Sequence, residues 1–487
     1  MKHVTERLPK SRVLRVLVFT LLLTLTFVLV VSAASTTKIL STNFTLINFG
    51  SALANVHADY FKDNGSAWTA DAGNTDFTIP ADGGQKIIRQ YFDGTLTVGQ
   101  GSAVISSDQP LGSVAQILAR GQTPTSGAYT GFSQTSSTFY VPLVTRRLST
   151  ASGLANSQIM IQNTGGSSTT VDVEFIGTTT WTNTGISIPA STTYYYDLDG
   201  ETNLSENWAG SAVVTANGSD QIVVISNFFL GADTMQTFNA FRAEDIGTSW
   251  LVPLFTSRLL NGLSSPIAVQ NLSGGTLAIG DVDVDCIKDG GSPGTDFSMS
   301  NTSAIPDNGA YYFNPVTDMT IQASWYGACR ITSTGGVVAF VQMRYVPGTN
   351  AAAYEAIKGD GTDLNAFIPL VAKRGANGFA TAVTIQNLNE SSTASVTFTY
   401  IPSPDYTGSS SNIVVGPYTI PAGGSLIHNH RLAGTGSGTG QHNLPDEWFG
   451  SLTVTSSDQP IHGFVQLTNI IEATGDTFMA HNAFTQP

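Results

Sequence analysis

The strongest constraint on this chain is a sequence pattern that recurs four times along its 487 residues. In each copy a hydrophobic run ends at an asparagine and a turn, and the four copies read FTLINFG, IMIQNTGG, IAVQNLSGG and VTIQNLNES. The marker asparagines are Asn48, Asn163, Asn271 and Asn387, which are 115, 108 and 116 residues apart. A recurrence at this spacing means that the chain is an array of similar units.

Further blocks follow each marker asparagine in the same order. An alternating run is followed by TIPADGG, SIPASTT, AIPDNGA or TIPAGGS, and then by two apolar runs around a polar turn, headed by Gly101, Gly210, Gly327 or Gly450. The first and last copies spell this turn SSDQP. Each copy closes with a short aromatic segment, GAYTGF, TFNAF, AYEAI or AHNAF. Alternating runs separated by turns predict β-strands.

The predicted fold is all-β, with four tandem β-sandwich domains. Each unit has about seven short strands, which is the size of an immunoglobulin-like sandwich, and no long stretch after the leader repeats with the period of a helix. Only 11% of residues are charged, so serine, threonine and asparagine must form the outer faces of the strands. The domains are predicted at residues 35–136, 137–247, 248–363 and 364–487.

The first copy departs from the others. Copies two to four open with YVPLVTRRL, LVPLFTSRL and FIPLVAKRG, aligned at Pro142, Pro253 and Pro369, whereas about nine residues separate the leader from FTLINFG. The first copy also has Gly99 where the others have a tryptophan. We therefore expect its sandwich to lack an edge strand and to leave an open edge, which is a pairing site.

The N-terminus has the pattern of an export leader. Five basic residues precede an uncharged run from Val16 to Val31, and small residues follow, so residues 1–34 are predicted to be a signal peptide cleaved near Ala33 or Ala34. An uncleaved anchor that crosses the membrane through residues 13–31 is the alternative. Either reading predicts a secreted protein of the cell surface.

The charge balance excludes one class of partner. Without the leader the chain has 16 basic and 34 acidic residues, a net charge of 16 − 34 = −18. No basic patch is left to displace phosphate counterions, so no nucleic-acid partner is expected. An acidic secreted surface attracts divalent cations instead.

The two cysteines, Cys286 and Cys329, both fall on predicted strands of the third copy. An oxidising compartment favours a disulfide between these strands, and two buried free thiols are the alternative. Thiolate catalysis is not expected, because the third copy has no histidine to activate a thiol.

Two groups of residues are candidate metal ligands. His428, His430 and His442 form the only concentration of histidine, and the first two lie on one face of a predicted strand. The loop DLDGET supplies Asp197, Asp199 and Glu201, which makes calcium the one cofactor worth considering. The alternative is that the histidines pack where other copies have aromatic rings, and that the carboxylates face solvent.

Aromatic runs and a recurring arginine complete the candidate sites. Tyr195 and Tyr312 lie in the runs YYY and YYF, which are candidates for stacking on sugar rings, although a strand turns alternate rings inward to the core. The arginines at one repeat position, Arg147, Arg258 and Arg374, each follow the opening proline by five residues. We expect them to form interdomain contacts that fix the angle between successive domains.

The IQN, IPA and GSAVVTS…DQP blocks resemble the tandem immunoglobulin-like or fibronectin-like repeats of secreted bacterial surface proteins. The resemblance implies a non-enzymatic structural or adhesive protein, a rod of four sandwiches on the order of 150 Å long that assembles with itself into a surface layer or fibre. A carbohydrate-binding module that recognises cell-surface polysaccharide is the alternative. The resemblance transfers no catalytic residue, and no common reaction motif occurs in the chain.

Overall fold

The computed structural model describes residues 40–485, apart from 120–122, 151, 219–220, 232, 347, 349, 434–443 and 472–473. The predicted leader and His442 therefore lie outside the described residues. Nearly all of the regular structure is antiparallel β-sheet, as the sequence predicts. Among the described residues, no helix is long and apolar enough to cross a membrane.

The first repeat contains two small sheets. One has the order β4-β1-β6-β7 and the other the order β3-β2-β5. The strands are β1 (Leu40–Asn48), β2 (Ala54–Lys62), β3 (Asp76–Ile79), β4 (Gln85–Arg89), β5 (Gly101–Ser107), β6 (Leu111–Ala119) and β7 (Ser126–Thr130), with α2 (Ala72–Thr75) before β3 and the 3-10 turn η1 (Gln90–Phe92) after β4.

The second repeat adds a first strand to this plan. Its sheets have the orders β13-β10-β15-β16 and β12-β11-β14-β8-β17, and β9 pairs with β10. The elements are β8 (Thr138–Arg146), β9 (Leu148–Thr150), β10 (Gly153–Asn163), β11 (Thr169–Gly177), β12 (Trp181–Ile188), β13 (Thr193–Asp197), η2 (Leu198–Gly200), β14 (Trp208–Ala216), β15 (Ile222–Leu230), β16 (Thr234–Asn239), β17 (Phe241–Arg242) and η3 (Ala243–Asp245).

The fourth repeat has the same plan, with sheets β31-β28-β33-β34 and β27-β32-β29-β30. Its strands are β27 (Asn365–Lys373), β28 (Phe379–Asn387), β29 (Ala394–Pro402), β30 (Ile413–Ile420), β31 (Ser425–Asn429), β32 (Trp448–Ser456), β33 (Ile461–Asn469) and β34 (Phe478–Asn482).

The third repeat joins its two sheets through one long strand, β24 (Trp325–Tyr345), which pairs with β21 and β18 in its first half and with β20 and β25 in its second. This copy has TSTGG where the terminal copies have SSDQP, and the strand runs through that segment without a turn. The other strands are β18 (Gly247–Ser257), β19 (Leu263–Ser264), β20 (Ile267–Asn271), β21 (Val282–Lys288), β22 (Phe297–Ser300), β23 (Ala310–Phe313), β25 (Ala351–Glu355) and β26 (Ile357–Lys358).

The marker asparagines are buried, and each forms hydrogen bonds to backbone groups of its own repeat. Asn163 donates from Nδ2 to the carbonyl oxygens of Ser167 at 2.8 Å and Ile188 at 3.0 Å, and its Oδ1 accepts from the backbone N–H of Gly165 at 2.8 Å. Asn48, Asn271 and Asn387 make the same kinds of bond. One side chain thus satisfies several buried backbone groups, which explains why the position recurs.

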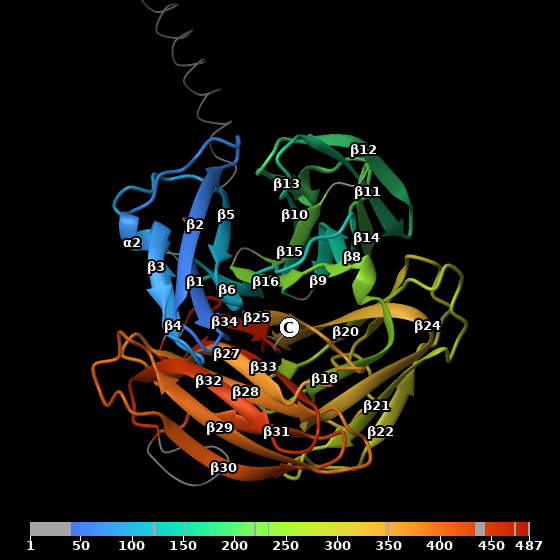
Figure 1. Cartoon of the computed structure of the whole chain (residues 1–487). Coiled ribbons are helices and arrows are strands. Elements are labelled where there is room, and N and C mark those ends of the chain that lie inside the picture. The colour runs from blue at the N-terminus through green and yellow to red at the C-terminus, as the bar shows by residue number, and fades with distance from the viewer. Residues whose placement is uncertain are drawn as a thin grey trace, which may run out of the picture.

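The four repeats close into a ring (Figure 1). Their closing strands meet at its centre, where β7 packs on β16, β16 on β25, β25 on β34, and β34 on β7. The packing of β7 on β16 is so close that a Cβ at Gly127 would lie 2.3 Å from Oγ1 of Thr237. The expected rod is therefore wrong. Each closing strand buries side chains against neighbouring repeats, and strand patterns alone do not reveal this contact.

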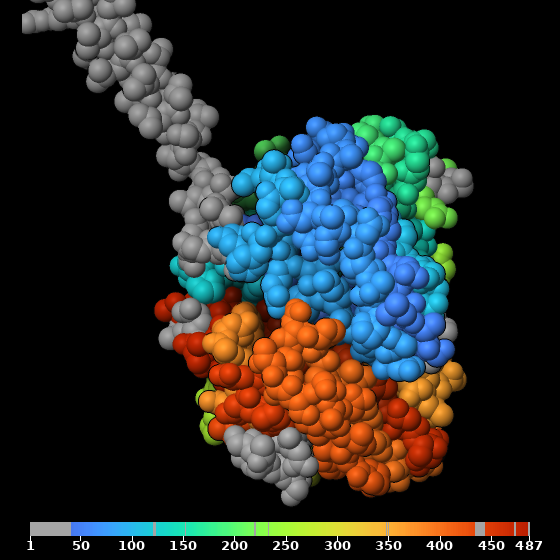
Figure 2. Space-filling model, turned by 60° about the vertical axis from the view of Figure 1, so that its left-hand side comes forward, coloured from blue at the N-terminus to red at the C-terminus, as the bar shows by residue number. Residues whose placement is uncertain are grey.

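Repeats 1 and 4 close the ring directly. Figure 2 shows repeat 1, in blue, lying on repeat 4, in orange. The ring of Phe49 lies 4.9 Å from that of Phe367 and 5.8 Å from that of Phe484, centroid to centroid. Ser451 also donates from Oγ to the carbonyl oxygen of Gly83 at 2.5 Å. The two copies that spell SSDQP are therefore neighbours in space.

Candidate functional site: the axial pocket

The closing strands all carry a polar residue at the same end. The positions are Thr130 in β7, Asn239 in β16, Glu355 in β25 and Asn482 in β34, and the strand pairings within the repeats align them. Since the four strands meet around the centre of the ring, these side chains gather at one end of its axis. All four are only partly buried.

Hydrogen bonds link the four residues across the repeats. Asn239 donates from Nδ2 to the carbonyl oxygen of Thr130 at 2.9 Å, and its backbone N–H donates to Oε1 of Glu355 at 2.5 Å. Asn482 donates from Nδ2 to the carbonyl oxygen of Glu355 at 2.9 Å and to its Oε2 at 3.2 Å. The result is a polar chain that runs through all four repeats.

The orientations of the side-chain amides of Asn239 and Asn482 follow from their hydrogen-bond partners. A carbonyl oxygen accepts only, so the atoms facing Thr130 and Glu355 must be the nitrogens of Asn239 and Asn482. The two amide oxygens are buried, and each has no hydrogen-bond partner among the described residues. Two buried acceptors without a partner next to the Glu355 carboxyl group carry a desolvation cost.

A pocket of about 280 Å³ opens at this end of the axis. Its lining includes the four polar residues at the ends of the closing strands, the polar or charged residues Gln134, Arg242, Asp245 and Lys358, and the aromatic residues Phe132, Phe241 and Trp250. Arg242 is held in place, because Nη2 lies 2.5 Å from Oδ1 of Asp245, Nε donates to Oδ2 at 3.1 Å, and Nη1 donates to Gln134. We call this site the axial pocket.

The carboxyl group of Glu355 is the most perturbed group in the axial pocket. Burial raises its pKa to about 7, and the negative charge of Asp245 adds to the shift, although the bond from the Asn239 N–H opposes it. A carboxyl group that changes charge near neutral pH in an open polar pocket is typical of a functional site.

The tyrosines proposed for sugar stacking are used in packing. Tyr195 donates from its hydroxyl to the carbonyl oxygen of Gly101 in repeat 1 at 3.3 Å, and burial raises its pKa to about 12. Tyr312 donates to Gln342, whose Nε2 in turn donates to Gln236 of repeat 2 at 2.6 Å. Tyr195 lies at the contact between repeats 1 and 2, and Tyr312 lies at the contact between repeats 2 and 3. The two side chains therefore form no common platform for a sugar.

The carboxylates proposed as calcium ligands are bound to protein groups. Asp197 accepts from the Asp199 N–H at 3.0 Å, and Glu201 accepts from the Tyr196 hydroxyl at 2.6 Å. Asp199 lies 3.4 Å from Nε of Arg147. Within the described ranges, no group of three or more histidine, cysteine or acidic side chains is arranged to hold a metal ion.

His428 and His430 lie close together, and both contact the hydroxyl group of Tyr400. The hydroxyl oxygen of Tyr400 lies 3.1 Å from Nδ1 of His428 and 2.9 Å from Nε2 of His430, and all three residues are fully buried. His428 also stacks on Phe398 with 3.7 Å between ring centroids. This is the packing alternative, in which a histidine takes the place of an aromatic ring of another copy.

The recurring arginines bond within their own repeats, so the predicted interdomain contacts are wrong. Arg147 donates from Nη1 to Glu206 at 3.0 Å, Arg258 donates to the carbonyl oxygen of Asp318 at 2.7 Å, and Arg374 donates to that of Arg431 at 3.1 Å. Every one of these bonds stays within one repeat. The arginines have positive φ angles of 44°, 44° and 49°, so each marks a bend after the first strand, and its guanidinium reaches back to a loop.

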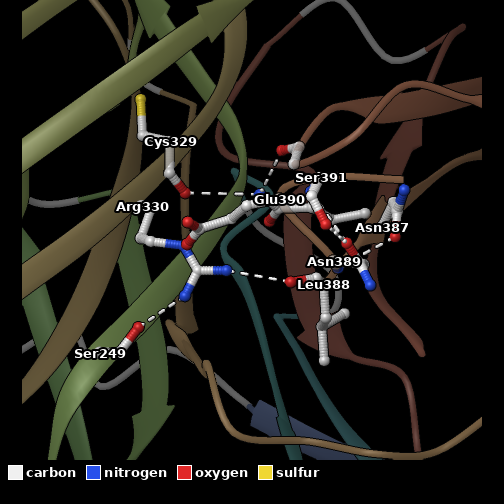
Figure 3. A network of polar contacts seen from close by, with 10 residues as sticks. Ser249, Cys329, Arg330, Asn387, Leu388, Asn389, Glu390 and Ser391 are labelled. Atoms are coloured by element: carbon white, nitrogen blue, oxygen red, sulfur yellow. Dashed lines mark hydrogen bonds and ion pairs between the residues drawn. The ribbon is translucent and has the colours of Figure 1, made fainter. Parts of the chain in front are cut away.

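Arg330, which the sequence did not single out, makes one of the contacts between repeats 3 and 4 (Figure 3). Arg330 donates from Nη1 to Oγ of Ser249 at 2.7 Å and from Nη2 to the carbonyl oxygen of Leu388 at 3.0 Å, and it pairs with Glu390. The other three junctions use a serine after the heading glycine: Ser102 to Ser191, Ser211 to Asn308, and Ser451 to Gly83. Repeat 3 has Ala328 at that position.

The disulfide between Cys286 and Cys329 is present, as predicted. The two residues are direct partners on β21 and β24, and both are buried. Their counterparts are Phe175 with Ala212 in repeat 2 and Tyr400 with Leu452 in repeat 4, which pair in the same register. The disulfide thus takes the place of a cross-strand pair of an aromatic ring and an aliphatic side chain.

The four polar residues of the axial pocket were not predicted from the sequence, although the aligned closing segments contain a pattern that marks them. They are the residues after the aromatic position in AYT, TFN, AYE and AHN, so aligning the closing segments places them in one column. The hydrogen bonds that link these residues run between different repeats. Only a closed arrangement gives them a common site.

No protein-family model matches this chain, and a search of curated proteins finds no match. Among solved structures, a Thermotoga maritima protein designated 1070 is 13% identical over 22% of this chain and 96% of its own, with a TM-score of 0.19. A tetra-tandem repeat from the extending region of a large adhesion protein is 12% identical over 89% of this chain and 91% of its own, with a TM-score of 0.10. These TM-scores are too low to carry a conclusion about fold or function.

Proposed function

We propose that the protein is a non-enzymatic, exported recognition protein of the cell surface that binds a sugar unit of a polysaccharide in the axial pocket. The observation that carries this proposal is the pocket itself, an open cavity of about 280 Å³ lined by polar and aromatic side chains, to which all four repeats contribute. Export is inferred from the leader and is consistent with a disulfide. The immunoglobulin-like assignment of the individual repeats is part of the same proposal.

The chemistry of the axial pocket suits a polyhydroxylated ligand. Sugar hydroxyls donate and accept hydrogen bonds, and the lining of the pocket offers Glu355, Asp245 and Gln134 as partners for them. Lys358 supplies a donor at the rim, where its side chain is 38% exposed. The cavity is near the lower end of the size range of small-molecule sites, roughly 300 Å³ and above, so it suits one sugar ring.

The test is a glycan array probed with the intact protein, followed by calorimetry with each glycan that binds. Glu355→Gln and Asn482→Leu each alter the polar lining of the pocket, and we expect either change to weaken binding at least tenfold. Glu174→Gln is the matched control, because Glu174 lies on β11, away from the axial pocket. Binding that is unchanged in both pocket variants contradicts the proposal.

A structural or adhesive protein that assembles with itself is the second candidate. Repeat 1 favours it, since Tyr91, Phe92 and Val98 are 52%, 66% and 103% exposed and exposed apolar groups favour association. Sedimentation velocity over a wide concentration range separates the two functions. Polymers that disappear in a Phe92→Ser variant support assembly, whereas a monomer that binds glycan supports recognition.

A further inference from the structure

A second cavity opens at the junction of repeats 1 and 4. Its volume is about 500 Å³, which lies within the size range of small-molecule sites, roughly 300–1,000 Å³. Phe49 and Phe367 line it, and its polar lining comes from Ser51, Asp82, Gln109, Asn365 and Thr453. We call it the junction pocket. Because both repeats contribute to its lining, it exists only in the closed ring.

The lining of the junction pocket suits a neutral compound that carries many hydroxyl groups. Its hydroxyl and amide side chains both donate and accept hydrogen bonds, as sugar hydroxyls do. Phe49 and Phe367, each 8% exposed, add a small apolar area for the C–H face of a sugar ring. Among the described residues that line the pocket, Asp82 is the one with a charge. Its carboxylate repels an anionic sugar.

The side chain of Gln109 reaches the junction pocket because a glycine lies beneath it. Gln109 belongs to the SSDQP turn of repeat 1, and a Cβ at Gly50 would lie 2.4 Å from its Oε1. In repeat 4 the corresponding glutamine, Gln459, accepts a hydrogen bond from Nδ2 of Asn389 at 2.7 Å. Gly50 and Asn389 each follow their marker asparagine by two residues. Repeat 1 therefore lacks this partner and presents its glutamine to the cavity.

The junction pocket and the axial pocket are neighbours. Asn482 lines the axial pocket, and Phe484 follows it by two residues. The ring of Phe484 lies 5.8 Å from that of Phe49, centroid to centroid, and the backbone of Phe484 pairs with that of Phe367. Because two residues of extended chain span about 7 Å, the two pockets lie on the order of 15 Å apart.

Repeat 1 connects the same two pockets. Gly131, in the lining of the axial pocket, donates from its backbone N–H to the carbonyl oxygen of Ser113 at 2.7 Å. The residue before Ser113, Gly112, packs so closely on Phe49 that a Cβ would lie 2.5 Å from Cζ of its ring. Close contacts in repeats 1 and 4 therefore hold the two pockets at a fixed spacing.

We propose that the junction pocket is a second sugar subsite, which binds another unit of the same neutral polysaccharide that occupies the axial pocket. This inference rests on the proposed function, because the axial pocket must bind the first unit. Binding at one subsite raises the effective concentration of the polymer at the other, so a chain that reaches both is held more tightly than a chain that reaches one. The protein then recognises a stretch of several sugar units.

The test is the dependence of affinity on chain length, measured by calorimetry with the intact protein. The probes are oligosaccharides of two, four, six and eight units from neutral β-glucan, xylan and mannan. In a series that binds, chains long enough to reach both pockets should bind at least tenfold more tightly than the disaccharide. Equal affinity at all lengths overturns the inference and leaves the proposed function standing, whereas a protein that binds no oligosaccharide contradicts both.

Two variants test whether the length dependence comes from the junction pocket. Gln109→Leu with Thr453→Val removes two polar groups with little change in volume, and Ser51→Trp places a large ring at the cavity from an exposed position. Each should lower the affinity for the longest chains at least fivefold and leave that for the disaccharide unchanged. Ser168→Trp, at an exposed site in the corresponding turn of repeat 2, is the matched control and should retain the wild-type length dependence. Length dependence that persists in both pocket variants overturns the inference.

Discussion

The carboxylate of Asp476 in repeat 4 accepts a hydrogen bond from the backbone N–H of Met235 in repeat 2, with 3.0 Å between Oδ2 and N. Its Oδ1 accepts from the N–H groups of Ala351 in repeat 3 and Phe478 in repeat 4, at 3.1 Å each. The Asp476 N–H donates to the carbonyl oxygen of Pro124 in repeat 1 at 2.7 Å. One fully buried residue thus binds all four repeats at the end of the axis opposite the axial pocket.

Asp476→Asn should destabilise the whole ring. The amide retains one acceptor oxygen for three N–H donors, and a hydrogen bond to a charged group contributes about 1.5–3 kcal/mol. We expect a loss of about 2 kcal/mol or more in the free energy of unfolding, measured by chemical denaturation. Asp360→Asn is the control, because the Asp360 side chain is 74% exposed, and its effect should be within about 0.5 kcal/mol.

Glu355 should make stability fall as pH rises towards neutrality. Its pKa is about 7 in the folded protein against an ordinary 4.5, so the folded state retains a proton that the unfolded state releases. The stabilisation is complete below pH 4.5 and is lost as pH rises through 7, by on the order of 2 kcal/mol after allowance for partial exposure. Unfolding of wild type and Glu355→Gln between pH 4 and 8 measures this effect: the two should be closest in stability at pH 4, where Glu355 is neutral like glutamine, and the wild type should lose stability relative to the variant as pH rises. A constant difference would contradict the assignment.

The ring closure depends on Phe49. Its side chain is 8% exposed and packs between Phe367 and Phe484 of repeat 4. Phe49→Ala should cost about 3 kcal/mol of unfolding free energy, as for other buried aromatic rings, and small-angle scattering should show a larger radius of gyration when repeats 1 and 4 separate. Leu53→Ala, in the same repeat and at a 54% exposed site, should leave both measurements unchanged.

The disulfide of repeat 3 should be replaceable by the packing used in repeat 2. Removing a bond that links residues 43 apart by Cys286→Ser with Cys329→Ser should cost roughly 2–4 kcal/mol. Cys286→Phe with Cys329→Ala copies the pair Phe175 and Ala212 and should recover part of that loss. Thermal unfolding with and without reductant measures this effect, and reductant should change only the wild type. Equal stability of the two double variants would contradict the replacement.

Much of the local structure could be predicted from the sequence. The marker asparagines, the alternating runs and the Pro-containing turns identified the strands and the fourfold repeat, because these features are satisfied within one unit. Cys286 and Cys329 could be paired for the same reason, since both lie on strands of one repeat. The prediction of interdomain contacts for Arg147, Arg258 and Arg374 was wrong. These arginines recur at one position of the repeat, but they bond to loops of their own repeats.

By itself the sequence determined the secondary structure, the number of repeats and the disulfide, because short-range alternation, turn chemistry and a fixed period depend on residues close together or similarly placed in each copy. Only the tertiary structure decided that the repeats form a ring and that Thr130, Asn239, Glu355 and Asn482 share one pocket. These residues are more than 100 positions apart in the chain, and they become neighbours only when closing strands from four repeats pack around one axis. That packing depends on the shapes of buried surfaces, which a linear pattern does not record.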